Sequence, residues 1–181
     1  MSHIVHLMGP SCAGKSTVIN ELLRIAPNDV AAVEVGKMLR AKHGEAAFAG
    51  QAAPAWSQAE AWNLYLEGVN AGIGQHKKII IVDGQPRDKQ QATDIVGRWR
   101  RPHLSSFLML HAEHEERERR CRADNGNRDL EKRLQRLTND YRNCYTVLAH
   151  LLMADQVIRV IDTSKMADAS ALAEQILAEY A

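Results

Sequence analysis

The stretch Gly9-Pro-Ser-Cys-Ala-Gly-Lys-Ser-Thr17 decides how the chain folds, because it joins a predicted strand at 4–8 to a predicted helix at 15–25. It matches the pattern GxxxxGK[ST], in which glycines let backbone N–H groups turn inward around phosphate oxygens at a helix N-terminus. A strand before the loop and a helix after it are the context that this pattern requires. The stretch therefore predicts a phosphate-binding loop at the start of an α/β domain.

Short apolar runs rich in Val, Ile and Leu alternate with longer helical patterns along the chain. The runs cover 4–8, 30–35, 79–83, 104–110 and 157–161, and the helical patterns cover 15–25, 57–68, 89–98, 130–153 and 168–180. This alternation implies βαβ units with parallel strands. We expect one domain over residues 1–181, folded as a three-layer α/β/α sandwich around a five-stranded parallel sheet.

The composition argues against nucleic acid and membranes as partners. Lys and Arg number 23 against 22 Asp and Glu, so the formal net charge of +1 gives no overall attraction for a polyanion. No apolar run approaches the ~20 residues of a membrane span, and no basic segment followed by a long apolar one opens the chain. The three cysteines form no CxxC pair, which is typical of a reducing compartment. We expect an unprocessed, soluble, cytoplasmic monomer.

Two polar groups are predicted to act with the loop. Lys15 would place its charge between the β and γ phosphates of a nucleotide, and the Ser16 hydroxyl would bind Mg²⁺ directly. Asp83 follows four apolar residues, so a buried strand delivers its carboxylate to the carboxyl edge of the sheet, where such folds bind ligands. There it would hold Mg²⁺ through water. The alternative is an aspartate that only caps the next turn.

Further motifs follow the loop in chain order. They are Val33-Glu-Val-Gly36-Lys-Met-Leu-Arg40, Gly50-Gln-Ala-Ala-Pro54, Asp83-Gly-Gln-Pro-Arg87, Arg122-Ala-Asp-Asn with Leu130-Glu-Lys-Arg133, and Ile161-Asp-Thr-Ser-Lys165. In this order they resemble the [ST]xG[DE]xLR, Gxx[VL]P, DG[FY]PR, lid-arginine and IDxSK motifs of the nucleoside monophosphate kinases of the adenylate kinase and UMP/CMP kinase family. The resemblance spans nearly the whole chain. It implies a P-loop NTPase fold with a helical acceptor-binding flap at 35–68 and a short lid at 119–129.

The resemblance also implies an activity, the transfer of a phosphoryl group from ATP with Mg²⁺ to a nucleoside monophosphate. The implied catalytic residues are Lys15, Asp83, Arg87, Arg122 and Arg133, the last two bridging donor and acceptor. ATP would contact Gly9, Ser11, Cys12, Ala13, Gly14, Lys15, Ser16, Thr17, Lys165 and either Arg119 or Arg120. The acceptor would contact Val35, Gly36, Arg40, Gln51, Ala52, Ala53, Gly84, Gln85, Arg87, Gln91, Arg122 and Arg133. Converging arginines suit this chemistry, because their planar forks neutralise charge that spreads over phosphate oxygens.

Departures from the family pattern leave the acceptor open. Val35 stands where the family has a hydroxyl or a smaller residue, Lys37 replaces an acid, and Gln85 replaces an aromatic. The loop itself is closer to the guanylate kinase style. One alternative is a small-molecule kinase of similar fold with a hydroxyl acceptor such as gluconate, shikimate or a nucleoside, which would need a general base. Another is an inactive nucleotide-binding interaction module, which would need no bridging arginines.

The charged run at 113–122 holds four acids and four arginines. Its first half, including Arg117, has the pattern of a solvated helix held by ion pairs, and only its last four residues belong to the predicted lid. His111 and His114 are three residues apart but lack a third ligand, so we expect no metal site there.

Overall fold

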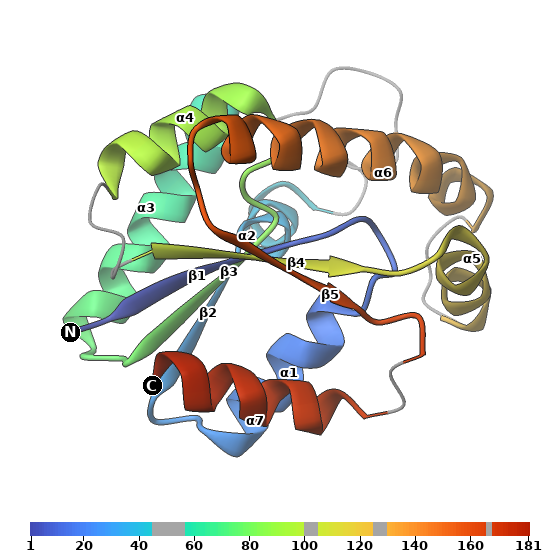
Figure 1. Cartoon of the computed structure of the whole chain (residues 1–181). Coiled ribbons are helices and arrows are strands. Elements are labelled where there is room, and N and C mark those ends of the chain that lie inside the picture. The colour runs from blue at the N-terminus through green and yellow to red at the C-terminus, as the bar shows by residue number, and fades with distance from the viewer. Residues whose placement is uncertain (45–56, 100–104, 125–129, 166–167) are drawn as a thin grey trace.

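The computed structural model describes residues 1–44, 57–99, 105–124, 130–165 and 168–181, without the side chains of residues 132, 133 and 136. The described chain contains a sheet of five strands, all parallel, in the order β2-β3-β1-β4-β5 (Figure 1). The strands are β1 (His3–Met8), β2 (Val30–Glu34), β3 (Ile79–Asp83), β4 (Ser105–His111) and β5 (Ile158–Asp162). The predicted three-layer α/β/α architecture is confirmed.

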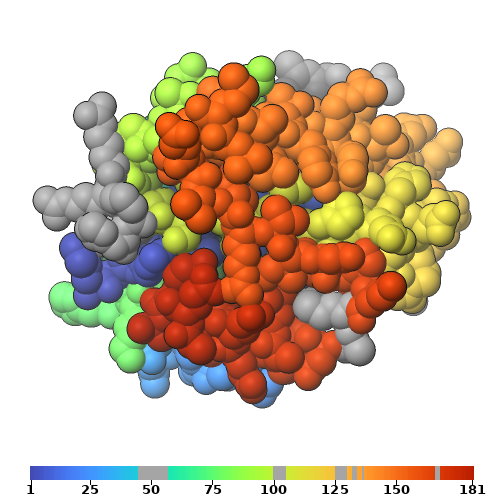
Figure 2. All heavy atoms as spheres, in the orientation of Figure 1, coloured from blue at the N-terminus to red at the C-terminus, as the bar shows by residue number. Residues whose placement is uncertain are grey.

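Helices cover both faces of the sheet. On one face lie α1 (Lys15–Ile25) and α7 (Ala169–Tyr180); on the other lie α3 (Gln58–Gly74), α4 (Lys89–Arg98) and α6 (Leu130–Met153). The helices α2 (Val35–His43) and α5 (His114–Ala123) follow the carboxyl ends of β2 and β4. In Figure 2 the edge strand β5 lies between α6 and α7 on the face toward the viewer. No helix in the described ranges is long and apolar enough to cross a membrane.

Several predicted boundaries differ from the observed ones by one residue or more, and two of the differences have a clear physical reason. The second strand was expected to include Val35, which instead begins α2. Glu34 pairs with Asp83, the last residue of β3, so the strand has no neighbour to pair with beyond this point. The helix expected to end at residue 68 continues to Gly74. Gly68 does not stop it, because its missing side chain lets α3 approach β2: a Cβ there would lie 2.6 Å from Val33.

A chain of polar side chains crosses the core at His6, which is fully buried. Tyr65 Oη lies 3.1 Å from His6 Nε2 and accepts a 2.6 Å hydrogen bond from Trp99 Nε1. Because an indole N–H can only donate, the tyrosine hydrogen is left for an unprotonated Nε2. Burial lowers the His6 pKa to about 4, so the ring is neutral at physiological pH.

We expect the free energy of unfolding to fall as the pH drops from 6.5 toward 4. Unfolded His6 binds a proton near pH 6.5, whereas folded His6 does so only near pH 4. The contribution of neutral His6 to the free energy of unfolding is therefore complete above pH 6.5. It is lost between pH 6.5 and 4, by up to about 3 kcal/mol. Urea unfolding between pH 7.5 and 4.5 checks this against His6→Gln, whose curve should be flatter. Equal slopes in the two proteins would contradict the assignment.

Candidate functional site

The glycine-rich loop lies between β1 and α1 at the carboxyl edge of the sheet, as the sequence predicts. Gly9 has a φ of 140°, and a Cβ there would lie only 2.4 Å from the carbonyl oxygen of Leu110 on β4. Both the conformation and the close approach require glycine. Further along the loop, Cys12 and Gly14 also have positive φ values, of 64° and 93°. These turns carry the chain directly into the first turn of α1.

The N-terminus of α1 is prepared for an anion. Its N-cap, Gly14, has no capping side chain, and no acid lies in the first turn. The first N–H groups of the helix are thus left for a ligand at the positive end of the helix dipole. Lys15 Nζ donates to the carbonyl oxygens of Gly9 at 2.8 Å and Pro10 at 3.1 Å, so the ammonium folds over the loop itself. Ser16 and Thr17 are exposed beside it.

Asp83 lies beside the loop, because β3 pairs with β1 in a register that places Asp83 opposite Leu7. Its Oδ1 atom is buried and has no hydrogen-bond partner. A buried carboxylate oxygen is costly to leave unpaired, so this one fits the predicted contact with metal-bound water. Among the described residues no group of three or more His, Cys, Asp or Glu is placed to hold a metal. Magnesium bound by Ser16 and, through water, by Asp83 would depend on nucleotide phosphates for further ligands.

Two predicted acceptor arginines converge on Gly36. A Cβ at this glycine would lie 3.4 Å from Arg87 Nη2 and 3.7 Å from Arg40 Nη1, so the two guanidinium groups face the same small space. Arg87 is held by its Nε, which donates to the carbonyl oxygen of Gly84 at 2.8 Å. No acid in the described chain forms an ion pair with Arg87. These contacts leave its Nη groups for an anion.

Gln91 and Gln85 lie near this arginine pair in the chain but differ from the predicted arrangement in detail. Gln91 Oε1 accepts a 2.7 Å hydrogen bond from the backbone N–H of Arg87, so this amide oxygen helps to position the arginine. Its contact with an acceptor base stays a prediction. Gln85 is buried, and its Oε1 has no partner. Val35 is also buried, in the core beneath the site.

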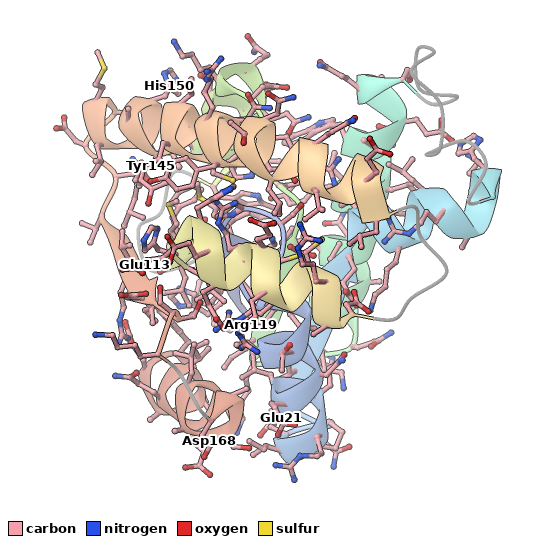
Figure 3. The ribbon with its side chains drawn as sticks, turned by 90° about the vertical axis from the view of Figure 1, so that its right-hand side faces the viewer. Glu21, Glu113, Arg119, Tyr145, His150 and Asp168 are labelled. Carbon is pink, nitrogen blue, oxygen red and sulfur yellow. The ribbon has the colours of Figure 1, made fainter. Side chains whose placement is uncertain are left out.

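The helix α5 crosses the carboxyl edge of the sheet between α6 and α1 (Figure 3). Of the two arginines considered for the donor base, Arg120 lies at the loop: its Nη1 would be 3.6 Å from a Cβ at Gly14. Arg119 instead pairs with Glu116, with its side chain 69% exposed. Of the two, the structure therefore brings Arg120 and not Arg119 to the loop, and the contact with ATP stays a prediction. Hydrogen bonds from Arg119 and then Arg120 lower the Glu116 pKa to about 2.

Thr163 connects α5, β4 and the loop, and sequence reasoning missed it. Its Oγ1 lies 2.9 Å from the carbonyl oxygens of both Ala13 and His111, and 3.3 Å from Arg120 Nη1. Arg120 Nη2 also donates to the Thr163 carbonyl oxygen. Thr163 belongs to the IDTSK motif, in which the predicted contact with ATP is Lys165. That lysine is exposed two residues further on.

The expectation that Arg117 is solvated is wrong. It is 1% exposed, and it donates to the carbonyl oxygens of Ala112 at 3.1 Å and Leu137 at 3.0 Å. Its guanidinium carbon also lies 5.0 Å from the centre of the Tyr141 ring. Arg117 therefore joins α5 to α6 by satisfying backbone carbonyls inside the protein.

Several predicted residues are not brought to the loop by the described structure. Arg122 pairs with Glu118 at 2.6 Å, and its side chain is 56% exposed. Arg133 is in the first turn of α6, but its side chain lies outside the described part. Gln51, Ala52 and Ala53 of the flap also lie outside the described residues, as do residues 125–129 of the lid. Their roles stay predictions.

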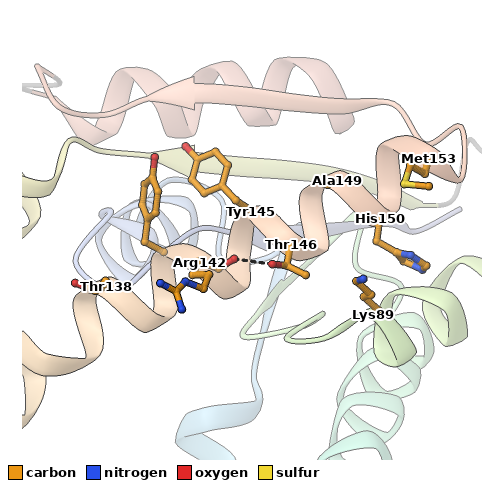
Figure 4. Close-up of a pocket in the computed structure, with 9 residues that line it drawn as sticks. Lys89, Thr138, Arg142, Tyr145, Thr146, Ala149, His150 and Met153 are labelled. Carbon is orange, nitrogen blue, oxygen red and sulfur yellow. Dashed lines mark hydrogen bonds between the residues drawn. The ribbon is translucent and has the colours of Figure 1, made fainter.

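One hollow of the described surface lies away from these groups. It measures ≈ 710 Å³ and lies across the outer face of α6, with Lys89 of α4 at one side and Tyr145 at the other (Figure 4). It is open to solvent and contains none of the predicted site residues. The chemistry-bearing groups gather instead at the loop, Asp83 and the arginine pair.

The all-parallel five-stranded sheet flanked by helices fits a Rossmann-like or P-loop architecture. Comparison of the chain with protein-family models and with curated proteins found no match in either set. The functional argument therefore rests on the site itself.

Replacing Thr163 by valine, which keeps the shape and removes the hydroxyl, should lower the free energy of unfolding by about 1–3 kcal/mol, because the buried Ala13 carbonyl oxygen loses a donor. Urea unfolding measures this. Thr146→Val on the exposed surface of α6, where the hydroxyl donates to the Arg142 carbonyl oxygen of the same helix, is the matched control and should change stability by less than about 0.5 kcal/mol. Similar losses in the two variants would show that Thr163 does not hold the loop.

Proposed function

We propose that the protein is a nucleoside monophosphate kinase, which transfers the γ-phosphoryl group of ATP to the phosphate of a nucleoside monophosphate and yields ADP and a nucleoside diphosphate. The observation that carries this proposal is the approach of Arg40 and Arg87 to the same space above Gly36. Two guanidinium groups repel each other at short range, and a phosphate dianion bound by both removes that cost.

The donor would bind at the glycine-rich loop. The uncapped N–H groups of α1 suit the phosphates, and Lys15 would exchange its bonds to the Gly9 and Pro10 carbonyl oxygens for phosphate oxygens. Magnesium, when bound with ATP, would neutralise charge on the β and γ oxygens. Arg120 beside Gly14 provides a further cation on the donor side. Arg122 and Arg133 remain the candidates for bridging the two phosphates, as the resemblance implies.

The arginine pair favours a phosphorylated acceptor over a hydroxyl one. An attacking hydroxyl needs a general base, whereas a phosphate oxygen is already ionised at neutral pH and needs only to be positioned. Arg87 is fixed for this purpose at both ends of the residue, by Gln91 at its backbone and by Gly84 at its side chain. A protein that only binds nucleotides would have no use for this second anion site.

A panel of acceptors tests the proposal. The protein is incubated with ATP, Mg²⁺ and each of AMP, dAMP, CMP, UMP, GMP and dTMP, and diphosphate formation is followed by ion-exchange chromatography. At least one monophosphate should be converted with matching formation of ADP. If none is converted above background ATP hydrolysis, the kinase assignment is wrong.

Arg87→Ala should lower kcat/KM for the acceptor by at least about 100-fold, because the migrating charge loses a fixed cation. ATP affinity, measured by calorimetry, should stay within about twofold, since Arg87 is placed on the acceptor side. Arg98→Ala removes the same charge from the last turn of α4, beside Trp99, and serves as the control. An equal loss of ATP affinity and turnover in Arg87→Ala would remove Arg87 from the acceptor site.

A further inference from the structure

A carboxylate from α6 lies directly on the glycine-rich loop. The Ser11 hydroxyl, in the third residue of the loop, donates a hydrogen bond to Asp140 Oδ2. The two residues are 129 positions apart in the chain, so this is a contact between separate elements. This contact is unexpected, because the backbone of the loop is arranged to bind an anion and the Asp140 carboxylate beside it would repel one.

The next turn of the same helix holds Asp140 in this place. Cys144 lies four residues further along α6 and is close enough to the loop for the backbone of Gly9 and the ammonium of Lys15 to affect its thiol, although burial is the largest influence and raises the Cys144 pKa. Leu137 and Val147, on the same helix face, are buried. Two successive turns of α6 thus lie against the loop, and they place the Asp140 carboxylate beside Ser11.

Among the side chains that the structure describes, which leave out those of residues 132, 133 and 136, no Lys, Arg or His forms an ion pair with Asp140. Two cations near Cys144 hydrogen-bond elsewhere: Lys15 to two loop carbonyl oxygens and Arg117 to two backbone carbonyl oxygens. Ser11 supplies a neutral hydrogen bond only. The Asp140 carboxylate thus lies beside the loop on its α6 side, where its charge acts on any nucleotide phosphate that the loop binds.

We propose that Asp140 is a specificity-determining residue for the donor, which makes the loop select a magnesium–nucleotide complex over the metal-free nucleotide. The inference rests on the proposed donor site. Metal-free ATP carries about four negative charges at neutral pH and its magnesium complex about two, so the same carboxylate repels the metal-free form more strongly. The N–H groups of the loop and Lys15 attract both forms of the nucleotide. Asp140 repels the metal-free form more than the magnesium complex, and this creates the difference in their affinities.

Direct binding tests the inference without any turnover. The dissociation constant of the non-hydrolysable analogue AMP-PNP is measured by calorimetry with excess Mg²⁺ and again with EDTA, for the wild-type protein and for Asp140→Asn. The asparagine keeps the size and the hydrogen bond to Ser11. It should tighten metal-free binding about tenfold and binding of the magnesium complex less than about threefold, because charge repulsion scales with ligand charge.

Two further variants make the outcome decisive. Ser11→Ala removes the hydrogen bond that holds the carboxylate, and it should shift the ratio of the two dissociation constants in the same direction but less. Asp94→Asn removes one charge from the exposed surface of α4 and should leave the ratio unchanged. The ratio is the readout because a general weakening of the loop affects both constants equally. A ratio in Asp140→Asn equal to that of the wild type, or a wild-type protein that binds both forms equally, overturns the inference.

The outcome is separable from that of the proposed function. A protein that binds AMP-PNP with the predicted dependence on Asp140 but phosphorylates no monophosphate would support the donor selectivity and refute the kinase. A protein that phosphorylates a monophosphate while Asp140→Asn leaves the ratio unchanged would support the kinase and refute the donor selectivity. If neither form of the nucleotide binds, both proposals are wrong.

Discussion

The parallel pairing of β1 between β3 and β4 is the constraint on which the candidate site depends. Because all strands run in the same direction, the turns that follow them meet at one edge of the sheet. The register then places Leu7 opposite Asp83 and Met8 opposite Met109, so the glycine-rich loop begins beside the only carboxylate delivered by β3 and against the end of β4. The close approach of Gly9 to Leu110 fixes that position.

Charge at this edge is organised differently from charge over the whole chain. The formal net charge is only +1, yet Lys15, Arg40, Arg87 and Arg120 all lie near the loop or the acceptor space. Acids keep some arginines in place, as Glu116 does for Arg120, while Arg87 is oriented by neutral backbone and amide groups. Fixed cations held by neutral partners keep their charge available for a ligand. Asp140 is the opposing charge, and its place on the loop gives the site a means of discriminating between anions.

Most of the fold could be predicted because its signals are local. The bounds of α1, β3, α4 and α6 match the predicted ranges, since apolar periodicity and capping residues such as Asp88 mark them in the sequence. Distant contacts could not be predicted. Arg117 appeared solvated because the carbonyl oxygen of Leu137 that it binds lies on another helix. Arg119 and Arg120 are adjacent in the sequence but about 100° apart around α5, so only packing decides which one faces the loop.

We propose that donor and acceptor phosphates meet between the glycine-rich loop and the Arg40–Arg87 pair. A compound that joins adenosine to the nucleoside of the preferred acceptor through five phosphates tests this most directly, by its binding in competition with each substrate. We expect this compound to displace ATP and the monophosphate together and to bind more tightly than either. Displacement of ATP alone, with the monophosphate still bound, would contradict a shared phosphate-transfer site.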